Sequence, residues 1–208
     1  MFGIIGYGSF VLSSILLNIT PGADTIYILT NSLVSGRKNG VISDLGISTG
    51  ILIHTVLAAL GLSVILAESV IAFNAMKICG AIYLMIMGIK SFFSSKGFVQ
   101  EISDKKESTF KIYIQGVLTN ALNPKVALFF LALLPQFVIT DNQYGAIPFL
   151  ILGLTFFCTS TLWCIIIAFL SSYLNKILTK NEKIKIIANK STGIIYILLG
   201  LNILRAHQ

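Results

Sequence analysis

Six long apolar runs constrain this chain more than any other feature of its sequence. A helix needs about 20 apolar residues to cross a bilayer core of roughly 30 Å, and the six runs are of that order. They cover about residues 4–34, 45–67, 70–92, 112–138, 145–174 and 187–206. Charged residues make up only 11% of the 208 positions, against about 25% in soluble domains. The sequence therefore predicts an all-α integral membrane protein with six transmembrane helices.

The second and third runs are separated by a short polar interruption. Reading 45–92 as one segment would leave five spans, but Ala-Glu-Ser at 67–69, with Asn74 and Lys77, favours two helices. The first run lacks the preceding basic segment of a removable signal peptide and is longer than such a peptide requires. We therefore expect the first run to be retained as the first span.

The basic residues gather in alternate loops, which predicts the direction of the chain across the membrane. Twelve of the 15 fall in or beside three predicted loops: Arg37 and Lys38; Lys90, Lys96, Lys105, Lys106 and Lys111; Lys176, Lys180, Lys183, Lys185 and Lys190. Because basic loops stay cytoplasmic, we expect 94–110 and 175–190 inside, with 139–145 and both termini outside. This distribution also accounts for the net charge of +7 without a nucleic-acid surface.

The two halves of the chain share a weak internal repeat. Pro21 and Pro124 interrupt the first and fourth runs, and a Gly-x-x-Tyr pattern followed by glycine recurs at 80–88 and 193–200. Because each half holds three spans, an odd number, the second half must be inverted relative to the first. We expect one transmembrane domain over 1–208, with repeat one at about 1–93, a cytoplasmic loop at 94–111 and repeat two at about 112–208.

The first run contains the stretch NITPGADT, beginning at Asn18, which a regular spanning helix does not favour. Proline lacks a backbone N–H and collides with the preceding turn, and a carboxylate at mid-membrane costs roughly 2.5 to 3.5 kcal/mol. We expect Pro21 and Gly22 to unwind a short segment. The side chains of Asn18 and Thr20 can replace the lost hydrogen bonds. Asp24 then lies in the first turn of the continuing helix, where the helix dipole favours a negative charge.

The fourth run carries a matching break. Asn120, Asn123 and Pro124 interrupt it, and Lys125 follows directly. Interrupted helices in corresponding positions of two repeats indicate a transporter's binding site. A proline kink beside a chance polar cluster is the alternative, but opposite charges buried in matching places are costly to keep without a use. We therefore predict a site between the two breaks, with Asp24 as the one acidic residue deep in the membrane.

The second run places a histidine on a glycine face. Gly46, Gly50 and His54 are spaced by four residues, which puts them on one face of a helix. The glycines let another backbone approach closely, so we expect His54 beside that contact. A hydrogen bond to a carbonyl and a proton-linked or substrate-facing role are both open for this histidine. We interpret the Gly–Tyr–Gly faces at 80–88 and 193–200 as helix packing.

Four stretches together resemble the LysE/RhtB family of bacterial amino-acid exporters. They are NITPGADT, GISTGILIH, GAIYLMIMGIK and NALNPKVALFFLALLPQF, one in each of the first four runs. The resemblance covers most of the chain and weakens after about residue 145. Family members usually have proline where this chain has Ala23, but Asp24 is present. The resemblance implies a multi-pass efflux carrier in the bacterial inner membrane, driven by the proton gradient, for amino acids or their derivatives.

The chain is therefore expected to be a secondary exporter, and not an enzyme. An amino-acid zwitterion suits a site with one carboxylate and one ammonium, lined by Asp24, His54, Asn123 and Lys125. A passive channel, or an efflux carrier for another small metabolite, is the alternative. A channel predicts rings of charge or a carbonyl filter, and the sequence offers no pattern of either kind.

The remaining expectations concern bound groups and partners. Cys79, Cys158 and Cys164 lack metal-type spacing, so we expect free buried thiols, no metal site and no cofactor. The expected partners are a small zwitterionic substrate, the lipid bilayer and, through the glycine faces, a second copy of the chain in a homodimer.

Overall fold

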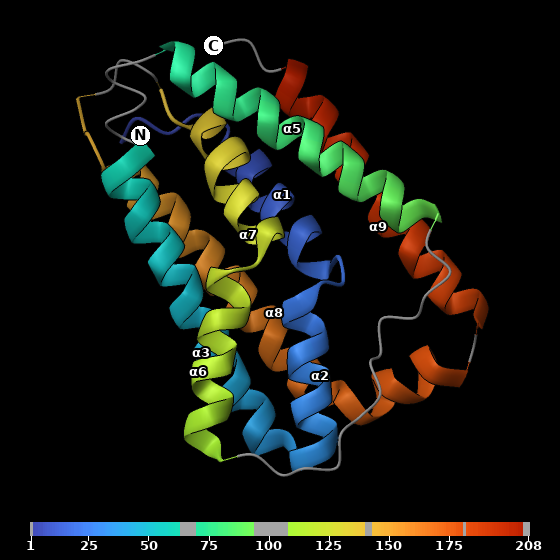
Figure 1. Cartoon of the computed structure of the whole chain (residues 1–208). Helices are drawn as coiled ribbons and strands as arrows, with labels where there is room; N and C mark the ends of the chain where they lie inside the picture. Colours follow the sequence, from blue (N-terminus) through green and yellow to red (C-terminus); the bar gives the residue numbers. More distant parts are fainter. Residues whose placement is uncertain (1, 63–69, 94–107, 140–142, 181, 206–208) are drawn as a thin grey trace.

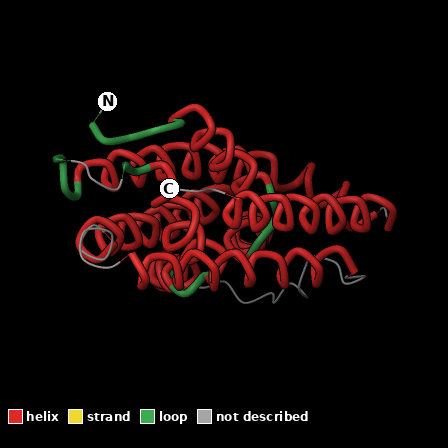
Figure 2. The backbone as a smooth tube through the Cα atoms, turned by 90° about the horizontal axis from the view of Figure 1, so that it is seen from above, coloured by secondary structure: helices red, strands yellow, loops and turns green. Residues whose placement is uncertain are grey.

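The computed structural model describes residues 2–62, 70–93, 108–139, 143–180 and 182–205. The longer helices are α1 (Tyr7–Ile19), α2 (Ala23–Ser35), α3 (Arg37–Leu57), α5 (Val70–Phe93), α6 (Thr109–Ala121), α8 (Ile147–Lys180) and α9 (Glu182–Arg205). The short ones are η1 (Ala58–Leu62), α7 (Pro124–Leu128), η2 (Phe129–Leu133) and η3 (Leu134–Phe137). Figure 2 shows that helices make up almost all of this backbone. The predicted all-α class is confirmed over the described residues.

The helices differ in how well they suit a membrane span. Arg37–Leu62 and Ile147–Ser171 are each long and apolar enough to cross a bilayer. Two further candidates are bent pairs, α1 with α2 at 50° and Thr109–Ala121 with Pro124–Phe137 at 43°. The described parts of α5 and α9, over the third and sixth apolar runs, do not meet the same requirement. The described residues thus contain two to four candidate spans, and the six-span inverted repeat stays a prediction.

Two groups of helices pack in the molecule. Helix α3 packs against α2, α6 and α8, while α5 lies along α9 (Figure 1). Glycines allow the close approaches. A Cβ atom on Gly46 of α3 would collide with the Tyr113 carbonyl of α6, and one on Gly88 of α5 would lie 2.7 Å from the Gly193 carbonyl of α9. The interpretation of the glycine faces as helix packing is confirmed at these positions.

The two ends of the first bent pair lie at opposite ends of the bundle. At one end, Ile4 bridges Val138, and the Ile5 amide donates to the Phe137 carbonyl at 2.9 Å. At the other, α2 turns into α3 at Gly36, whose φ of +84° favours glycine. Figure 1 shows the start of α6 at that same end. The N-terminal segment and Val138 therefore share one end, as the predicted topology requires. Most of the predicted loop 94–111 lies outside the described residues.

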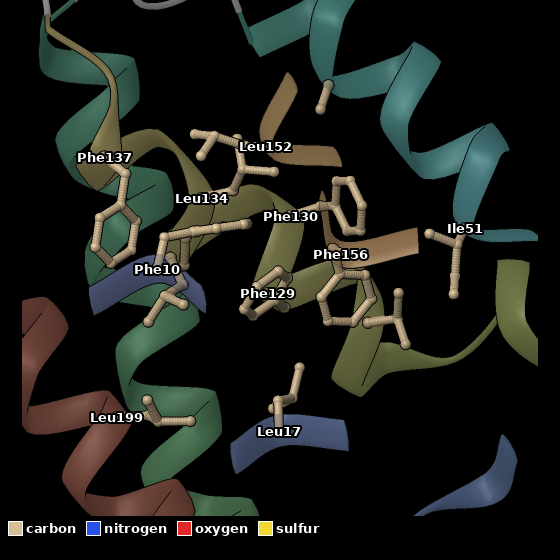
Figure 3. Close-up of a cluster of buried hydrophobic side chains, with 14 of the residues drawn as sticks. Phe10, Leu17, Ile51, Phe129, Phe130, Leu134, Phe137, Leu152, Phe156 and Leu199 are labelled. Atoms are coloured by element: carbon tan, nitrogen blue, oxygen red, sulfur yellow. The ribbon is translucent and has the colours of Figure 1, made fainter. Parts of the chain in front are cut away.

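An aromatic cluster fills the bundle between the helix breaks and the end that carries Ile4 (Figure 3). Phe10 of α1 and Phe129 of η2 are fully buried there, with ring centroids 5.7 Å apart. Phe156 of α8 packs against Phe129 at 4.4 Å. In a bilayer such rings stabilise the bundle by van der Waals packing, because lipid tails are as apolar as the side chains. The cluster therefore forms a packed apolar wall on one side of the helix breaks.

Candidate functional site

Both predicted helix breaks are present, and each has a local cause. Helix α1 ends at Ile19, and the Thr20 hydroxyl donates back to the Leu16 carbonyl at 2.7 Å. Helix α2 restarts at Ala23, after Pro21 and Gly22. Because proline has no N–H, the chain cannot continue the α1 hydrogen-bond ladder through this position. The unwound segment covers Thr20 to Gly22, as the sequence predicts.

The second break is capped by an asparagine. Helix α6 ends at Ala121, and the Asn123 Oδ1 accepts from the Lys125 amide at 3.0 Å, which caps α7. Pro124 occupies the first turn of α7, where its missing N–H costs nothing. The break therefore places Lys125 one residue past the start of α7.

Lys125 joins the two breaks. Its Nζ donates to the Thr20 carbonyl at 2.7 Å, at the C-terminal end of α1. This end of a helix carries partial negative charge, which favours a cation. Gly22 makes room for the lysine side chain, since a Cβ there would lie 3.3 Å from Lys125 Cδ. Residues 105 positions apart thus meet, as the matched breaks predict.

Asp24 lies in the first turn of α2 and is held from α6. Its Oδ2 accepts from Asn120 Nδ2 at 2.9 Å. Among the described residues, the buried Asp24 Oδ1, Asn120 Oδ1 and Asn123 Nδ2 make no hydrogen bond. Buried polar atoms are seldom left unpaired, and three in adjoining side chains indicate a polar ligand site.

The charges of Asp24 and Lys125 interact across this site without direct pairing. Asp24 interacts electrostatically with Lys125 and with His54. Within the described part of the chain, Asn120 donates to the carboxylate, the Asn123 side chain lies beside it, and the Thr20 carbonyl accepts from the ammonium. Each charge is therefore fixed by its own neutral partner, which leaves both able to meet a ligand carrying the opposite charges.

His54 of α3 contacts the site from a third helix. Its Nε2 lies 3.2 Å from the Asn120 carbonyl, and its ring stacks on Phe130 with centroids 5.5 Å apart. Gly50 permits this approach, because a Cβ there would lie 2.7 Å from Asn120 Cβ. Of the two open interpretations, the contact with a backbone carbonyl is the one observed. His54 thus buttresses the residue that holds Asp24.

Two predicted residues stand apart from this network. Asn18 Nδ2 donates to Thr159 Oγ1 at 3.2 Å, which ties α1 to α8. The Pro124 side chain is exposed. Pro21 lies in the unwound segment itself, and the remaining predicted residues meet around Asp24: Thr20, Gly22, His54, Asn120, Asn123 and Lys125.

The expectation of Asp24 as the one acidic residue deep in the membrane leaves out Asp44, a second buried carboxyl group. Asp44 is only 1% exposed and lies inside the candidate span Arg37–Leu62. Asp44 falls just outside the second apolar run, which begins at about residue 45. The sequence does place Asp44 on a helix, because Gly40, Asp44 and Ser48 recur every four residues and so share one helix face.

One tyrosine and two cysteines differ from expectation. Tyr196 of α9 is 3% exposed and interacts electrostatically with Asp24, although its glycine face was assigned to packing. Cys164 is buried as expected, but Cys79 and Cys158 are exposed on the helix surface. No cluster of three His, Cys, Asp or Glu side chains that could hold a metal ion occurs within the described ranges.

Comparison with known proteins identifies the family of this chain. The sequence model of the LysE type translocator matches residues 15–207. The chain belongs to the LysE type translocator family. The family resemblance inferred from the four motifs is confirmed, and the chain is a membrane transporter by that membership.

Relatives of this LysE type translocator support the assignment. It is 36% identical over 195 residues to the "uncharacterized membrane protein YrhP" of Bacillus subtilis (strain 168), covering 89% of this chain and 92% of that protein. It is 33% identical over 147 residues to a "homoserine/homoserine lactone efflux protein" of Salmonella typhimurium, covering 71% of each. A protein of the same name from Salmonella typhi matches equally well. No solved structure gives a significant match.

Proposed function

We propose that this translocator is a secondary active exporter of amino acids or amino-acid derivatives. The observation that carries the proposal is the meeting of two helix breaks that bear one carboxylate and one ammonium, Asp24 and Lys125. The names of the Salmonella relatives, homoserine/homoserine lactone efflux proteins, support a small amino-acid-like substrate.

The site binds a zwitterion through complementary charges. The substrate ammonium binds Asp24 Oδ1, the carboxylate oxygen without a protein donor among the described residues. The substrate carboxylate binds the Lys125 ammonium and Asn123 Nδ2, which is also unpaired in the described part of the chain. Hydrogen bonds to charged groups contribute about 1.5–3 kcal/mol each. Asn120 and His54 position Asp24 and do not themselves hold the substrate.

Transport follows an alternating-access cycle between two inverted repeats, coupled to inward movement of a proton. The bent pairs of 50° and 43° support this arrangement, because the two breaks face each other at the site. The aromatic cluster around Phe129 closes one side of the site in the present conformation. In the bacterial inner membrane the Gly36 end is cytoplasmic, and both termini are outside. Gly88 and Gly193 pack within the chain, so they no longer argue for a homodimer.

A passive channel, or a carrier for a different metabolite, is the alternative. Purified protein in liposomes loaded with unlabelled L-homoserine separates a channel from a carrier. A carrier accelerates entry of labelled L-homoserine when the unlabelled compound is inside, whereas a channel does not. The same assay with a panel of amino acids identifies the preferred substrate. Asp24→Asn should abolish the acceleration at normal reconstitution.

Two outcomes would contradict the proposal. Flux that rises linearly with concentration, without acceleration by internal substrate, would indicate a channel. The absence of flux for every amino acid in the panel, with correctly folded protein, would place the substrate in another chemical class.

A further inference from the structure

A second buried carboxyl group lies between α3 and α8, apart from the site at the breaks. Asp44 is 1% exposed, and its Oδ1 accepts from the Ser48 hydroxyl at 3.4 Å. Ser48 shares a 2.7 Å hydrogen bond with the Thr161 hydroxyl of α8. The Cys164 thiol, also on α8, lies beside the carboxyl group. The α3–α8 contact thus encloses a small polar cluster of Asp44, Ser48, Thr161 and Cys164.

Among the side chains that the structure describes, no basic partner accounts for this carboxyl group. The described charged and titratable side chains on the elements packed against α3 are Asp24 and Tyr27 of α2, Lys111 and Tyr113 of α6, Lys125 of α7, and Cys158 and Cys164 of α8. Of these, Cys164 is the one whose contact with Asp44 is found. Arg37 and Lys38, at the start of α3 itself, are exposed. A carboxylate buried without a cation is strongly disfavoured, so such a group takes up a proton or another cation.

The partners of Asp44 suit a group that changes its protonation. Hydroxyl groups donate or accept hydrogen bonds, so Ser48 can serve both the carboxylate and the carboxylic acid. Asp24 is different, because Asn120 Nδ2 can only donate to it and Lys125 lies nearby. Asp24 is thus surrounded by hydrogen-bond donors and a cation, a pattern that suits binding of an ammonium group. The two carboxyl groups are thus fitted for different ligands.

Asp44 and the site at the helix breaks lie at different positions along α3. His54, whose contact is Asn120, lies ten residues from Asp44 on α3, about 15 Å at 1.5 Å per residue. Cys164 of α8 lies beside Asp44, and Asp24 and Lys125 are also within electrostatic range of it. One turn nearer the Gly36 end, Gly40 packs against the buried Ser32, whose hydroxyl is unpaired among the described residues. This polar hydroxyl continues the cluster toward that end.

We propose that Asp44 is the proton-binding site of the transporter, and that Asp24 is reserved for the substrate. This inference rests on the proposed function, since it names the residue that carries the coupling proton of the export cycle. In the state open to the Gly36 end, the Asp44 O–H bond breaks and water takes the proton. In the opposite state, the carboxylate regains a proton from water on the other side.

Infrared spectroscopy of purified protein tests proton binding without any transport substrate. The carbonyl stretch of a protonated carboxyl group is distinct from the carboxylate bands and shifts in heavy water. We expect this band in the wild type and in Asp24→Asn, and its loss in Asp44→Asn. Ser48→Ala should shift the band, because the hydrogen bond is lost while the carboxyl group remains. Ser14→Ala, a buried serine that donates to the Phe10 carbonyl, is the matched control and should leave the band unchanged.

A spectrum without this band over the accessible pH range, or a band that disappears in Asp24→Asn instead, would overturn the proposal. Failure of the export assay would not affect this readout, so the two proposals fail separately. If Asp44→Asn does not fold, the shift in Ser48→Ala still decides the assignment, since an unshifted band would place the protonated group elsewhere.

Transport driven by a pH gradient tests the role of that proton. Asp44→Asn should lose L-homoserine accumulation down to the level of empty liposomes, while exchange of labelled for unlabelled L-homoserine stays above that level. Asp24→Asn should lose both. Gradient-driven accumulation by Asp44→Asn at the wild-type level would contradict the proposal. Stimulation by sodium at constant pH that disappears in Asp44→Asn would assign a sodium ion to the site instead.

Discussion

Removing the charges of Asp24 and Lys125 together should harm the protein less than the two single losses added. Each charge has a neutral partner, since Asn120 holds Asp24 and the Thr20 carbonyl holds Lys125. Two unit charges 4 Å apart at an effective dielectric constant of about 20 attract by about 4 kcal/mol. The pair is half-buried and not in direct contact, so we expect a coupling energy of about 1–3 kcal/mol.

A double-mutant cycle in detergent measures this coupling. The free energy of unfolding is determined for the wild type, Asp24→Asn, Lys125→Met and the double variant. Lys190, an exposed lysine whose Nζ lies 5.7 Å from the Phe92 ring, gives the control pair, and Asp24→Asn with Lys190→Met should be additive. Additivity of Asp24→Asn and Lys125→Met within about 0.5 kcal/mol would refute the coupling.

Three further predictions concern packing, His54 and topology. Gly50→Val should destabilise the protein by about 1–3 kcal/mol through overpacking against α6, whereas Gly8→Ala, with open space around it, should not; equal unfolding energies for the two variants would contradict the close approach. His54→Gln can still donate to the Asn120 carbonyl and should keep export near the wild-type rate; loss of export at normal abundance would give the imidazole a proton-linked role. In a cysteine-free background, an impermeant thiol reagent should label Gln143→Cys in whole cells and Lys38→Cys only after permeabilisation, and the reverse pattern would invert the topology.

The breaks were predictable because their causes are local. Proline removes a hydrogen bond wherever it occurs, so Pro21 and Pro124 alone fix where α1 and α6 must end. The repeat argument then predicted that Asp24 and Lys125 would lie near each other. The positions of the breaks and the nearness of Asp24 to Lys125 both follow from where these residues occur along the chain.

The partners of those charges were not predictable from the sequence. Lys125 binds the Thr20 carbonyl instead of Asp24, because its side chain follows the space left by Gly22. The direction of the Lys125 side chain depends on how the two bent helix pairs pack against each other. Asn18 lies close to the break in sequence, yet its side chain points to Thr159 of α8. Side-chain direction around an unwound segment is a tertiary property.

Asp44 was missed for a different reason. An apolar run is counted from the residue after the last charged one, so a carboxyl group near the start of a span is assigned to the preceding loop. In the structure, α3 begins at Arg37, and Asp44 lies about two turns inside it. Its four-residue spacing with Gly40 and Ser48 is the sequence pattern that predicts its position on the glycine face of α3.

The central claim is that Asp24 holds the ammonium and Lys125 holds the carboxylate of one bound amino acid. Binding of L-homoserine to the purified protein is compared with that of 4-hydroxybutanoate, which lacks the amine, and 3-aminopropan-1-ol, which lacks the carboxylate. Asp24→Asn should weaken L-homoserine binding about 10- to 150-fold, the equivalent of 1.5–3 kcal/mol, and leave 4-hydroxybutanoate unaffected. Lys125→Met should weaken binding of L-homoserine and 4-hydroxybutanoate and leave binding of 3-aminopropan-1-ol unaffected. Equal weakening of all three ligands by either substitution would contradict the claim.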